Sequence, residues 1–294
     1  MLLRDFLREG VSRLWSLYPE REARNILLDL IENRLGVARY TYATDPDFSP
    51  GPEAQAILSE DLDRLSGGEP LQYVLGYSEF MGRRFRVTPD VLIPRPETEM
   101  LCSEAIKLVR GSSPIRILDL CTGSGCIAWT LAMEVPSATV YGIDISEKAL
   151  AVASSQVFSR SLSGAEAPVP ERSRRAVFLQ ADILADPPSF PCGQFDLILS
   201  NPPYIMESQR KDMRKNVLDH EPALALFVPD GDPLLFYRAV ANWSKTLLAA
   251  GGTGIVEIND LLGTRTRDLF IEAGFKKVEI LDDFSGKNRF VIFS

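Results

Sequence analysis

The chain has 294 residues, which leaves room for one full-sized core and a second, smaller module. Hydrophobic residues make up 45% and charged residues 24%, values that exclude collagen-like, coiled-coil and wholly disordered chains and favour a folded soluble protein. The net charge of −8 argues against indiscriminate phosphate binding but leaves room for a local basic patch; we expect no direct nucleic-acid binding.

We expect no targeting signal at the start of the chain. Residues Met1 to Asp5 reach charged side chains before any apolar run long enough for a signal peptide. Nowhere do about 18 uncharged apolar residues follow one another, as a membrane span would require. We therefore expect a cytoplasmic protein that does not contact membranes.

Three amphipathic helices are predicted for the first part of the chain. Apolar residues recur three and four apart, the spacing of helices that bury one face. These stripes occupy residues 3–14, 23–31 and 57–65. Pro52 lies near the start of the third helix and Gly67-Gly68 at its end. Residues 1–70 are therefore predicted to form a small helical domain.

Two connecting segments are predicted from composition. Residues 71–95 form a linker, in which short β-prone pieces from Tyr73 to Val87 indicate a hairpin around Met81-Gly82-Arg83. Residues Ser159 to Arg175 are rich in Ser, Pro, Glu and Arg, so we expect a mobile surface loop there.

After Pro94 the pattern alternates between apolar strands and helical stretches. The expected strands are residues 115–120, 140–143, 177–179, 195–200 and 255–258. Such alternation implies a mostly parallel sheet with helices on both faces and ligands at the carboxyl ends of the strands. Val278–Leu281 and Phe290–Phe293 lie too close together for a crossover helix and should pair antiparallel. Residues 96–294 are predicted to form this α/β catalytic domain.

A glycine-rich motif predicts a nucleotide-type pocket. The first strand runs directly into Cys121-Thr122-Gly123-Ser124-Gly125, and helical residues follow. Glycines let the backbone turn sharply and approach a ligand at the positive end of a helix. The spacing Gly123-x-Gly125-x-x-Ala128 also fits the dinucleotide fingerprint, so this motif alone leaves the ligand open.

Three acids at strand ends favour S-adenosylmethionine as the cofactor. Asp119 precedes the glycines and suits a cationic amino group, whereas a pyrophosphate would not tolerate it. Asp144 is placed to hold ribose hydroxyls, and Asp182 to accept a hydrogen bond from the adenine amino group. Alternatively, Asp144 and Asp182 cap the elements that follow them. The predicted cofactor-binding residues are Asp119, Thr122, Gly123, Ser124, Gly125, Asp144, Asp182 and Asn201.

The fourth strand ends in Asn201-Pro202-Pro203-Tyr204, beside the glycine motif in a doubly wound order. Two prolines stiffen the turn and keep the Asn201 side chain and the Pro202 carbonyl aimed at one point. Two converging acceptors suit a planar NH2 group, on which Tyr204 would stack. A proline-rich strand exit is the alternative interpretation. We predict that these four residues are catalytic and bind the acceptor.

We predict no functional role for the cysteines and the histidine. The four cysteines lack CxxC spacing and no neighbouring base is evident, so we expect reduced, mostly buried thiols and no metal site. They are Cys102, Cys121, Cys126 and Cys192. The single histidine, His220, is expected to pack on a surface or loop rather than to act as a base.

Together these motifs resemble the HemK-type release-factor glutamine methyltransferases. The resemblance covers most of the chain and rests on Glu69-Pro70-Leu71-Gln72-Tyr73 with Gly76, Val91–Glu99, Asp119–Gly125, Asn201–Tyr204 and Glu221–Leu224. Asn-Pro-Pro-Tyr is shared with enzymes that methylate the adenine amino group, whereas Ile93–Glu99 is more particular to this family. The chain departs from the family pattern after Leu224 and at Asn259, where a glycine is usual, and we expect neither departure to touch the transfer site.

The resemblance implies a fold and a reaction. The fold is a class I S-adenosylmethionine-dependent methyltransferase fold: Rossmann-like, with a mostly parallel sheet, an antiparallel last strand and a small N-terminal helical bundle that holds the release factor. The reaction transfers a methyl group to the side-chain amide nitrogen of a glutamine in peptide chain release factors, which tunes translation termination and leaves S-adenosylhomocysteine. We expect a monomer. Arg95 is expected to close over the pocket and bind substrate, while Glu97 and Glu99 also fit a helix-start pattern.

Three other functions compete with this interpretation. An N6-adenine methyltransferase acting on DNA or RNA would use the same pocket on a flipped base, but the chain has no evident basic DNA-reading domain. A noncatalytic protein-binding adaptor would not need Asn201–Tyr204, and a nicotinamide dehydrogenase would have no use for it.

Overall fold

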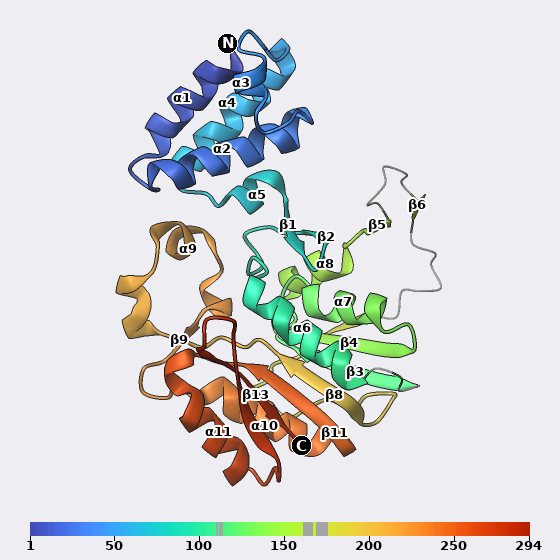
Figure 1. Cartoon of the computed structure of the whole chain (residues 1–294). Coiled ribbons are helices and arrows are strands. Elements are labelled where there is room, and N and C mark those ends of the chain that lie inside the picture. The colour runs from blue at the N-terminus through green and yellow to red at the C-terminus, as the bar shows by residue number, and fades with distance from the viewer. Residues whose placement is uncertain (110, 112–113, 161–166, 169–175) are drawn as a thin grey trace. The chain divides into compact units, whose positions relative to one another are not determined.

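The computed structural model describes residues 1–109, 111, 114–160, 167–168 and 176–294 (Figure 1). The chain divides into two compact units, one of Met1–Tyr77 with Met213–Glu221 and one of Ser78–Asp212 with Pro222–Ser294. Most of the loop predicted over residues 159–175 lies outside the described residues. At its margins β5 (Ser159–Arg160) pairs antiparallel with β6 (Ala167–Pro168).

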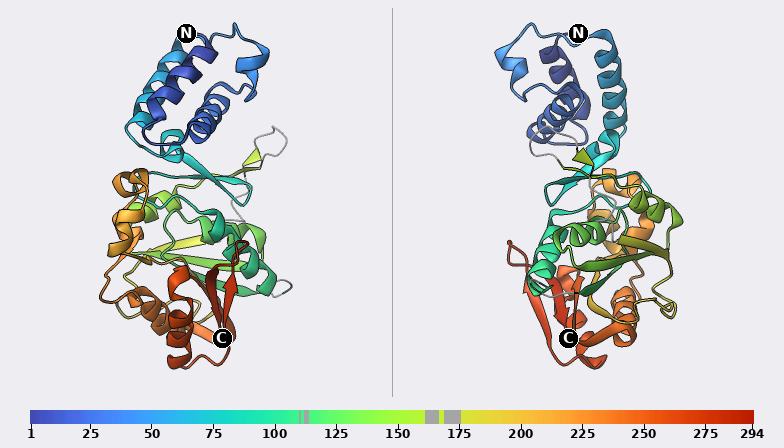
Figure 2. Two further views of the ribbon diagram at one scale, coloured as in Figure 1. Left: turned by 60° about the vertical axis from the view of Figure 1, so that its left-hand side comes forward. Right: turned by 90° about the vertical axis from the view of Figure 1, so that its right-hand side faces the viewer.

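The first unit contains the three predicted helices. They are α1 (Leu3–Leu14), α2 (Glu20–Leu35) and α4 (Pro52–Ser66), joined by α3 (Thr41–Thr44), α5 (Leu71–Leu75) and α9 (Lys215–His220). Helices α1, α2 and α4 lie side by side (Figure 2), and their apolar stripes bury Leu7, Leu27 and Leu62 in one core. His220, at the end of α9, packs beside Gly68, where an added methyl group would lie 3.5 Å from its Nε2.

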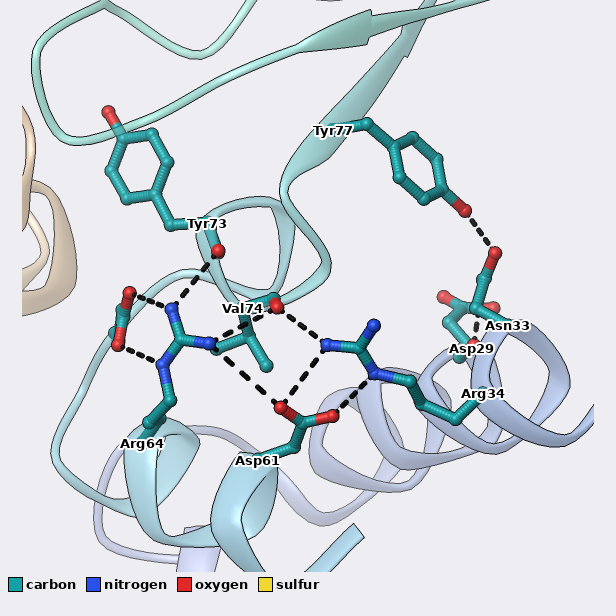
Figure 3. Close-up of polar contacts among 9 residues, drawn as sticks. Asp29, Asn33, Arg34, Asp61, Arg64, Tyr73, Val74 and Tyr77 are labelled. Atoms are coloured by element: carbon teal, nitrogen blue, oxygen red, sulfur yellow. Dashed lines mark hydrogen bonds and ion pairs between the residues drawn. The ribbon is translucent and has the colours of Figure 1, made fainter. Parts of the chain in front are cut away.

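A partly buried ion network joins α5 to the bundle (Figure 3). Asp61, only 4% exposed, accepts a hydrogen bond from Nε of Arg34 at 2.6 Å. Arg34 also donates to the main-chain carbonyl of Val74 at 2.8 Å. Arg64 donates to Glu69 at 2.6 Å and to the Tyr73 carbonyl at 3.1 Å. The segment Glu69–Val74 is therefore anchored to α2 and α4 through two backbone carbonyls and one carboxylate.

The predicted hairpin is present, with one correction at its start. Strands β1 (Tyr77–Phe80) and β2 (Arg83–Arg86) form a two-stranded sheet around Met81-Gly82. Residues from Tyr73 to Leu75, expected to begin the β-prone stretch, belong to helix α5 instead. Pro70 precedes this helical turn, and Gly76, with a φ of 83°, ends it in the left-handed conformation that glycine favours.

The second unit is built on a seven-stranded sheet with the order β12-β13-β11-β8-β3-β4-β7. Its strands are β3 (Ile115–Leu120), β4 (Ala138–Asp144), β7 (Ala176–Gln180), β8 (Phe195–Ser200), β11 (Leu248–Glu257), β12 (Val278–Asp282) and β13 (Asn288–Phe293). The strands from β7 to β11 run parallel, whereas β13 is antiparallel to both neighbours. The predicted α/β fold with an antiparallel last strand is confirmed. Because β3 lies between β4 and β8, the strand order reverses there and opens a crevice at the carboxyl ends.

Helices cover both faces of this sheet (Figure 1). Helices α6 (Pro96–Val109) and α7 (Cys126–Glu134) share a core with Ile117 of β3, together with Phe80 and Phe85 of the hairpin. Helices α10 (Leu235–Leu247) and α11 (Gly263–Glu272) share the other core with Leu118. Successive residues of β3 thus enter opposite cores, as strand geometry requires. Within the described residues, none of the helices has the length and apolar character that a membrane span needs.

Shorter elements complete the second unit. They are α8 (Glu147–Ser154), β9 (Ile205–Met206), β10 (Phe227–Val228) and the 3-10 turns Glu207–Asp212, Ala223–Ala225 and Asp260–Leu262. Strands β9 and β10 pair in parallel, which ties the chain after Asn201–Tyr204 to the segment after Ala225.

Candidate active site

The glycine loop connects β3 to α7 at the crevice. The main-chain N–H of Thr122 donates to the carbonyl of Ile143 at 2.9 Å, so the loop is bonded to the neighbouring strand β4. Gly125 is the N-cap of α7, with a φ of 79°. A Cβ at Gly125 would lie 3.1 Å from side chains of Trp129 and Ala153. Both the left-handed conformation and this close packing therefore favour glycine at this position.

Asp119 lies fully buried behind the glycine loop. Its Oδ2 accepts hydrogen bonds from the Thr122 hydroxyl at 2.5 Å and from the Ala128 N–H at 3.2 Å. Its Oδ1 has no hydrogen-bond partner among the described residues. Burial raises the pKa of this carboxyl to about 7, against the opposing effect of its two hydrogen bonds. Asp119 thus organises the loop and retains one unsatisfied oxygen.

The other two strand-end acids lie at the mouth of the crevice. Asp144 accepts the N–H of Gly123 through Oδ2 and the N–H of Ser146 through Oδ1, both at 2.9 Å. The N-cap of α8 is Ser146 itself, so Asp144 is not the helix cap of the alternative interpretation. Asp182 does cap a turn, because its Oδ1 accepts the N–H of Leu184 at 2.8 Å. Burial raises the pKa of Asp144.

One cavity of the second unit brings the two sequence motifs together. The predicted site residues that line it are Arg95, Thr122, Gly123, Ser124, Asp144, Asp182, Asn201 and Pro203. The predicted residues that do not line it are Asp119, Gly125, Pro202 and Tyr204. This grouping follows from the sheet order, because β3, β4 and β8 are neighbours and end at the same edge.

The tetrapeptide after β8 is held by side chains from distant segments. The Asn201 amide nitrogen donates to the hydroxyl of Thr98 at 3.1 Å. The Tyr204 hydroxyl donates to Glu257 at 3.1 Å, and the Tyr204 carbonyl accepts from Asn259 at 3.0 Å. Tyr204 is thereby held at both its ring and its backbone. Stacking of its ring on an acceptor amide stays a prediction.

We expected the two departures from the family pattern to leave the transfer site untouched, but both reach the candidate site. Asn259, which follows β11, donates a hydrogen bond to the Tyr204 carbonyl. Ala225, in the other departing stretch, lines the cavity. The physical reason is that β11 pairs with β8, with Val256 opposite Ser200, so its carboxyl end reaches the tetrapeptide.

Sequence reasoning also missed part of the cavity wall. The missed lining residues include Leu92, Thr98, Ile145, Leu184, Leu224 and Phe236. Ile145 and Leu184 are 45% and 50% exposed, and both line the cavity. Ile145 directly follows Asp144, and Leu184 lies two residues after Asp182. An apolar residue close behind a strand-end acid is the sequence pattern from which this part of the cavity wall could have been predicted. Apolar walls beside carboxylates suit a ligand that carries both a flat ring and hydroxyl groups.

The remaining candidate groups have structural partners. Glu99 accepts the Met81 N–H at 2.7 Å, which ties the first turn of α6 to the hairpin.

All four cysteines are free thiols, and burial raises the pKa of Cys126 to about 12, so this thiol is protonated near neutral pH. Among the residues the structure describes, no three His, Cys, Asp or Glu side chains gather as a metal site would require.

Fold and site define the class of the protein. Residues 117–220 match the model of a methyltransferase domain. The crystal structure of the hMettl16 catalytic domain in complex with MAT2A 3'UTR hairpin 6 has a similar fold, with a TM-score of 0.54 over 78% of this chain and 81% of that chain, at 13% identity. The chain is a methyltransferase by fold and by domain.

Sequence relatives narrow this class to a family. Residues 5–76 match the PrmC N-terminal domain. A release factor glutamine methyltransferase of Bacteroides thetaiotaomicron is 39% identical, covering 94% of each chain. One from Flavobacterium psychrophilum is 34% identical, covering 99% of this chain and 98% of the relative. The chain belongs to the release factor glutamine methyltransferase family.

Proposed function

We propose that this chain transfers a methyl group from S-adenosylmethionine to the side-chain amide nitrogen of a glutamine in a peptide chain release factor. One observation carries the proposal: Asp144 of the glycine-loop side and Asn201 of the Asn-Pro-Pro-Tyr side line the same cavity. Family membership supports the same reaction, because the relatives are named for it.

The residues on the donor side fit S-adenosylmethionine. The Oδ1 of Asp119 has no hydrogen-bond partner among the described residues, and a carboxylate oxygen suits the cationic amino group of the donor. The carboxylate of Asp144 suits ribose hydroxyls, and Ile145 offers an exposed aliphatic face for a flat ring. Asp182 lies on the same wall and suits the adenine amino group. When bound, this donor supplies an electrophilic methyl carbon.

The residues on the acceptor side hold a carboxamide. The Asn201 Oδ1 and the Pro202 carbonyl accept the two hydrogens of the glutamine NH2, which draws its nitrogen lone pair out of conjugation. A carboxamide nitrogen is a poor nucleophile, so alignment at near-attack distance supplies most of the rate. Tyr204 supports this turn, and Arg95 at the cavity wall contacts the substrate. The transfer would be a direct in-line displacement without an enzyme-bound intermediate: the bond from the methyl carbon to sulfur breaks as the bond to nitrogen forms, S-adenosylhomocysteine leaves, and the amide nitrogen releases one proton to solvent.

Recognition of the protein substrate belongs to the helical part of the chain. We assign residues 1–70 to substrate binding, residues 71–95 to the hairpin linker and residues 96–294 to catalysis. A cavity that holds one amide selects little else, whereas a standard protein–protein contact buries about 1,600 Å² in total. Residues 5–76 match an N-terminal domain model of their own, so this part of the chain is distinct from the proposed catalytic part.

Mass spectrometry tests the proposed reaction directly. The full chain is incubated with S-adenosylmethionine and a purified release factor, and fragment spectra locate any added methyl group. We expect one methyl group on a glutamine side chain, and at least about 100-fold slower methylation with the Asn201→Ala variant. Methylation of adenine in DNA or RNA under the same conditions, with release factor unmodified, would contradict the proposal and support the adenine alternative.

A further inference from the structure

A buried chain of hydrogen bonds connects the tetrapeptide to two residues outside both sequence motifs. The Thr98 hydroxyl donates to Glu257 Oε2 at 2.8 Å and accepts from the Asn201 amide nitrogen at 3.1 Å. The other oxygen of Glu257 accepts from the Tyr204 hydroxyl at 3.1 Å. Thr98 is 2% exposed and Glu257 is 0% exposed, so the bond between these two side chains is shielded from water.

The direction of each bond in this chain follows from the number of protons available. An ionised Glu257 can only accept, so it takes the single hydroxyl proton of Thr98. Having donated that proton, Thr98 can only accept from Asn201. The NH2 end of the Asn201 amide is thereby directed to Thr98. The oxygen end is the one left for an acceptor in the cavity that Asn201 lines.

We propose that Thr98 and Glu257 are positioning residues that select which end of the Asn201 side-chain amide is presented to the substrate glutamine. This inference rests on the proposed function, in which Asn201 Oδ1 accepts from the glutamine NH2. Neither residue touches the reacting atoms in this scheme. Without these directed hydrogen bonds, the Asn201 side-chain amide can rotate by half a turn. It then presents an NH2 group, which repels the NH2 of the substrate instead of holding it.

Glu257 is supported from several elements and can change its charge near neutral pH. Burial raises its pKa to about 7, against the hydrogen bonds from Thr98 and Tyr204 and the positive charge of Arg289. Titratable and charged groups that interact with it come from α6, α7, α10, β13 and the turn after β8; these are Glu97, Cys102, Cys126, Tyr204, Tyr237 and Arg289. A protonated Glu257 can donate to Thr98, which removes the requirement that Thr98 accept from Asn201.

A matched pair of threonine variants tests the proposal. Thr98→Val keeps the shape but removes the hydroxyl, and Thr98→Ser restores it. At saturating donor we expect the single-turnover rate on release factor to fall at least about tenfold in Thr98→Val and to recover to within about threefold of the parent rate in Thr98→Ser. Donor affinity, measured by calorimetry, stays within about twofold in both. Thr266→Val, at a buried threonine whose hydroxyl has no partner among the described residues, controls for loss of a buried hydroxyl.

Glu257→Gln supplies a second, independent readout. At saturating donor, we expect the single-turnover rate of the parent enzyme to rise with pH toward a plateau above about 7. The reason is that the ionised Glu257 carboxylate sets the direction of the hydrogen bonds through Thr98 to Asn201. In Glu257→Gln, the carboxamide does not titrate near pH 7, so we expect a rate that lacks this rise with pH. Thermal unfolding confirms that each variant is folded before its rate is interpreted.

The outcomes separate this inference from the proposed function. If Asn201→Ala is inactive while Thr98→Val keeps its parent rate and pH profile, the positioning role is wrong and the proposed function stands. If the parent enzyme leaves release-factor glutamine unmethylated, the proposed function itself fails. A tenfold loss in Thr98→Val that Thr98→Ser does not repair would also overturn the positioning role, since the hydroxyl would not be the cause.

Discussion

The carboxylate of Asp144 accepts the main-chain N–H of Gly123, with 2.9 Å between Oδ2 and the nitrogen. This bond joins the end of β4 to the glycine loop that follows β3. The same carboxylate accepts the N–H of Ser146, so it fixes two loops at once and still lines the cavity. A single acid therefore holds two loops in place at the cavity that we propose for the donor.

Donor binding should depend on this acid. Asp144→Ala removes a hydrogen-bonded charged partner, a loss of about 1.5–3 kcal/mol, which corresponds to roughly 10- to 150-fold weaker binding of S-adenosylmethionine. Calorimetry measures the change, and Asp186→Ala, at an exposed acid outside the cavity, is the control. Equal affinity of the Asp144→Ala and parent proteins, with the fold intact, would refute the assignment of the donor pocket.

Acceptor chemistry should fail selectively in Asn201→Ala. The side chain is proposed to act mainly through the acceptor amide, so we expect turnover to fall at least about 100-fold, comparable to the loss of one preorganised oxyanion-hole partner. Donor affinity should stay nearly unchanged. Single-turnover kinetics with release factor measure the first and calorimetry the second, with the exposed Asn242→Ala as control. A near-parent single-turnover rate is incompatible with the proposed role.

Substrate selection should depend on the helical part of the chain. A chain that begins at Ser78 keeps all of the two hairpin strands except Tyr77, and the hairpin residues Phe80 and Phe85 are buried in the core of the second unit. Provided circular dichroism shows that it folds, we expect it to bind S-adenosylmethionine but to methylate intact release factor with kcat/KM at least about tenfold lower. An unchanged kcat/KM would reassign residues 1–77 to a structural or regulatory role.

Stability without donor should fall between pH 5 and pH 8. Burial raises the pKa of Asp119 to about 7, above its unfolded value of 3.8. Its contribution to stability is therefore complete below about pH 4 and is lost as the pH rises through 7, a change of about 2–3 kcal/mol across this window. Glu257 shifts in the same direction. The chain has a single histidine, so few other groups titrate here.

Urea unfolding at pH 5 and at pH 8 measures this slope, which is the change in the free energy of unfolding with pH. Asp119→Asn should reduce it by roughly half, because Glu257 remains. Asp196→Asn is the control: its pKa is lowered by the hydrogen bond from Arg116, so that carboxylate stays ionised across the window and its loss leaves the slope unchanged. A parent slope of zero or of opposite sign would show that neither buried carboxyl titrates near pH 7.

Two acids on α4 should differ in their effect on the first unit. Asp61 is buried and bonded to Arg34, so Asp61→Asn should destabilise the bundle by about 1.5–3 kcal/mol, because the partly buried guanidinium loses its charged hydrogen-bond partner. Asp63 forms an exposed ion pair with Arg13, and Asp63→Asn should cost about 0–1 kcal/mol. Hydrogen exchange of the main-chain amides of α2 and α4 measures the loss of stability in each variant. Equal protection in the two variants would contradict this ranking.

The sequence alone determined the fold class and both motifs of the candidate site. Strands, turns and helix ends are marked by neighbouring residues, so the spacing of apolar residues and glycines predicted β3, β8 and the loops that follow them. Because carboxyl ends of parallel strands share one edge, the order of the motifs along the chain was enough to place Asp119–Gly125 beside Asn201–Tyr204. The short helix α5 was missed because a β-prone composition is a weaker guide than the proline and glycine that bound it.

Only the tertiary structure decided what holds the tetrapeptide in place. Thr98 and Asn201 are 103 positions apart, and Thr98 and Glu257 are 159 apart, yet they share one hydrogen-bond chain. That chain depends on β11 pairing with β8 and on α6 covering that edge, which no local pattern specifies. Helix α9 likewise joins the first unit from a distant part of the sequence. Local propensity acts over a few residues, whereas a buried polar network is set by which strands and helices become neighbours in the fold.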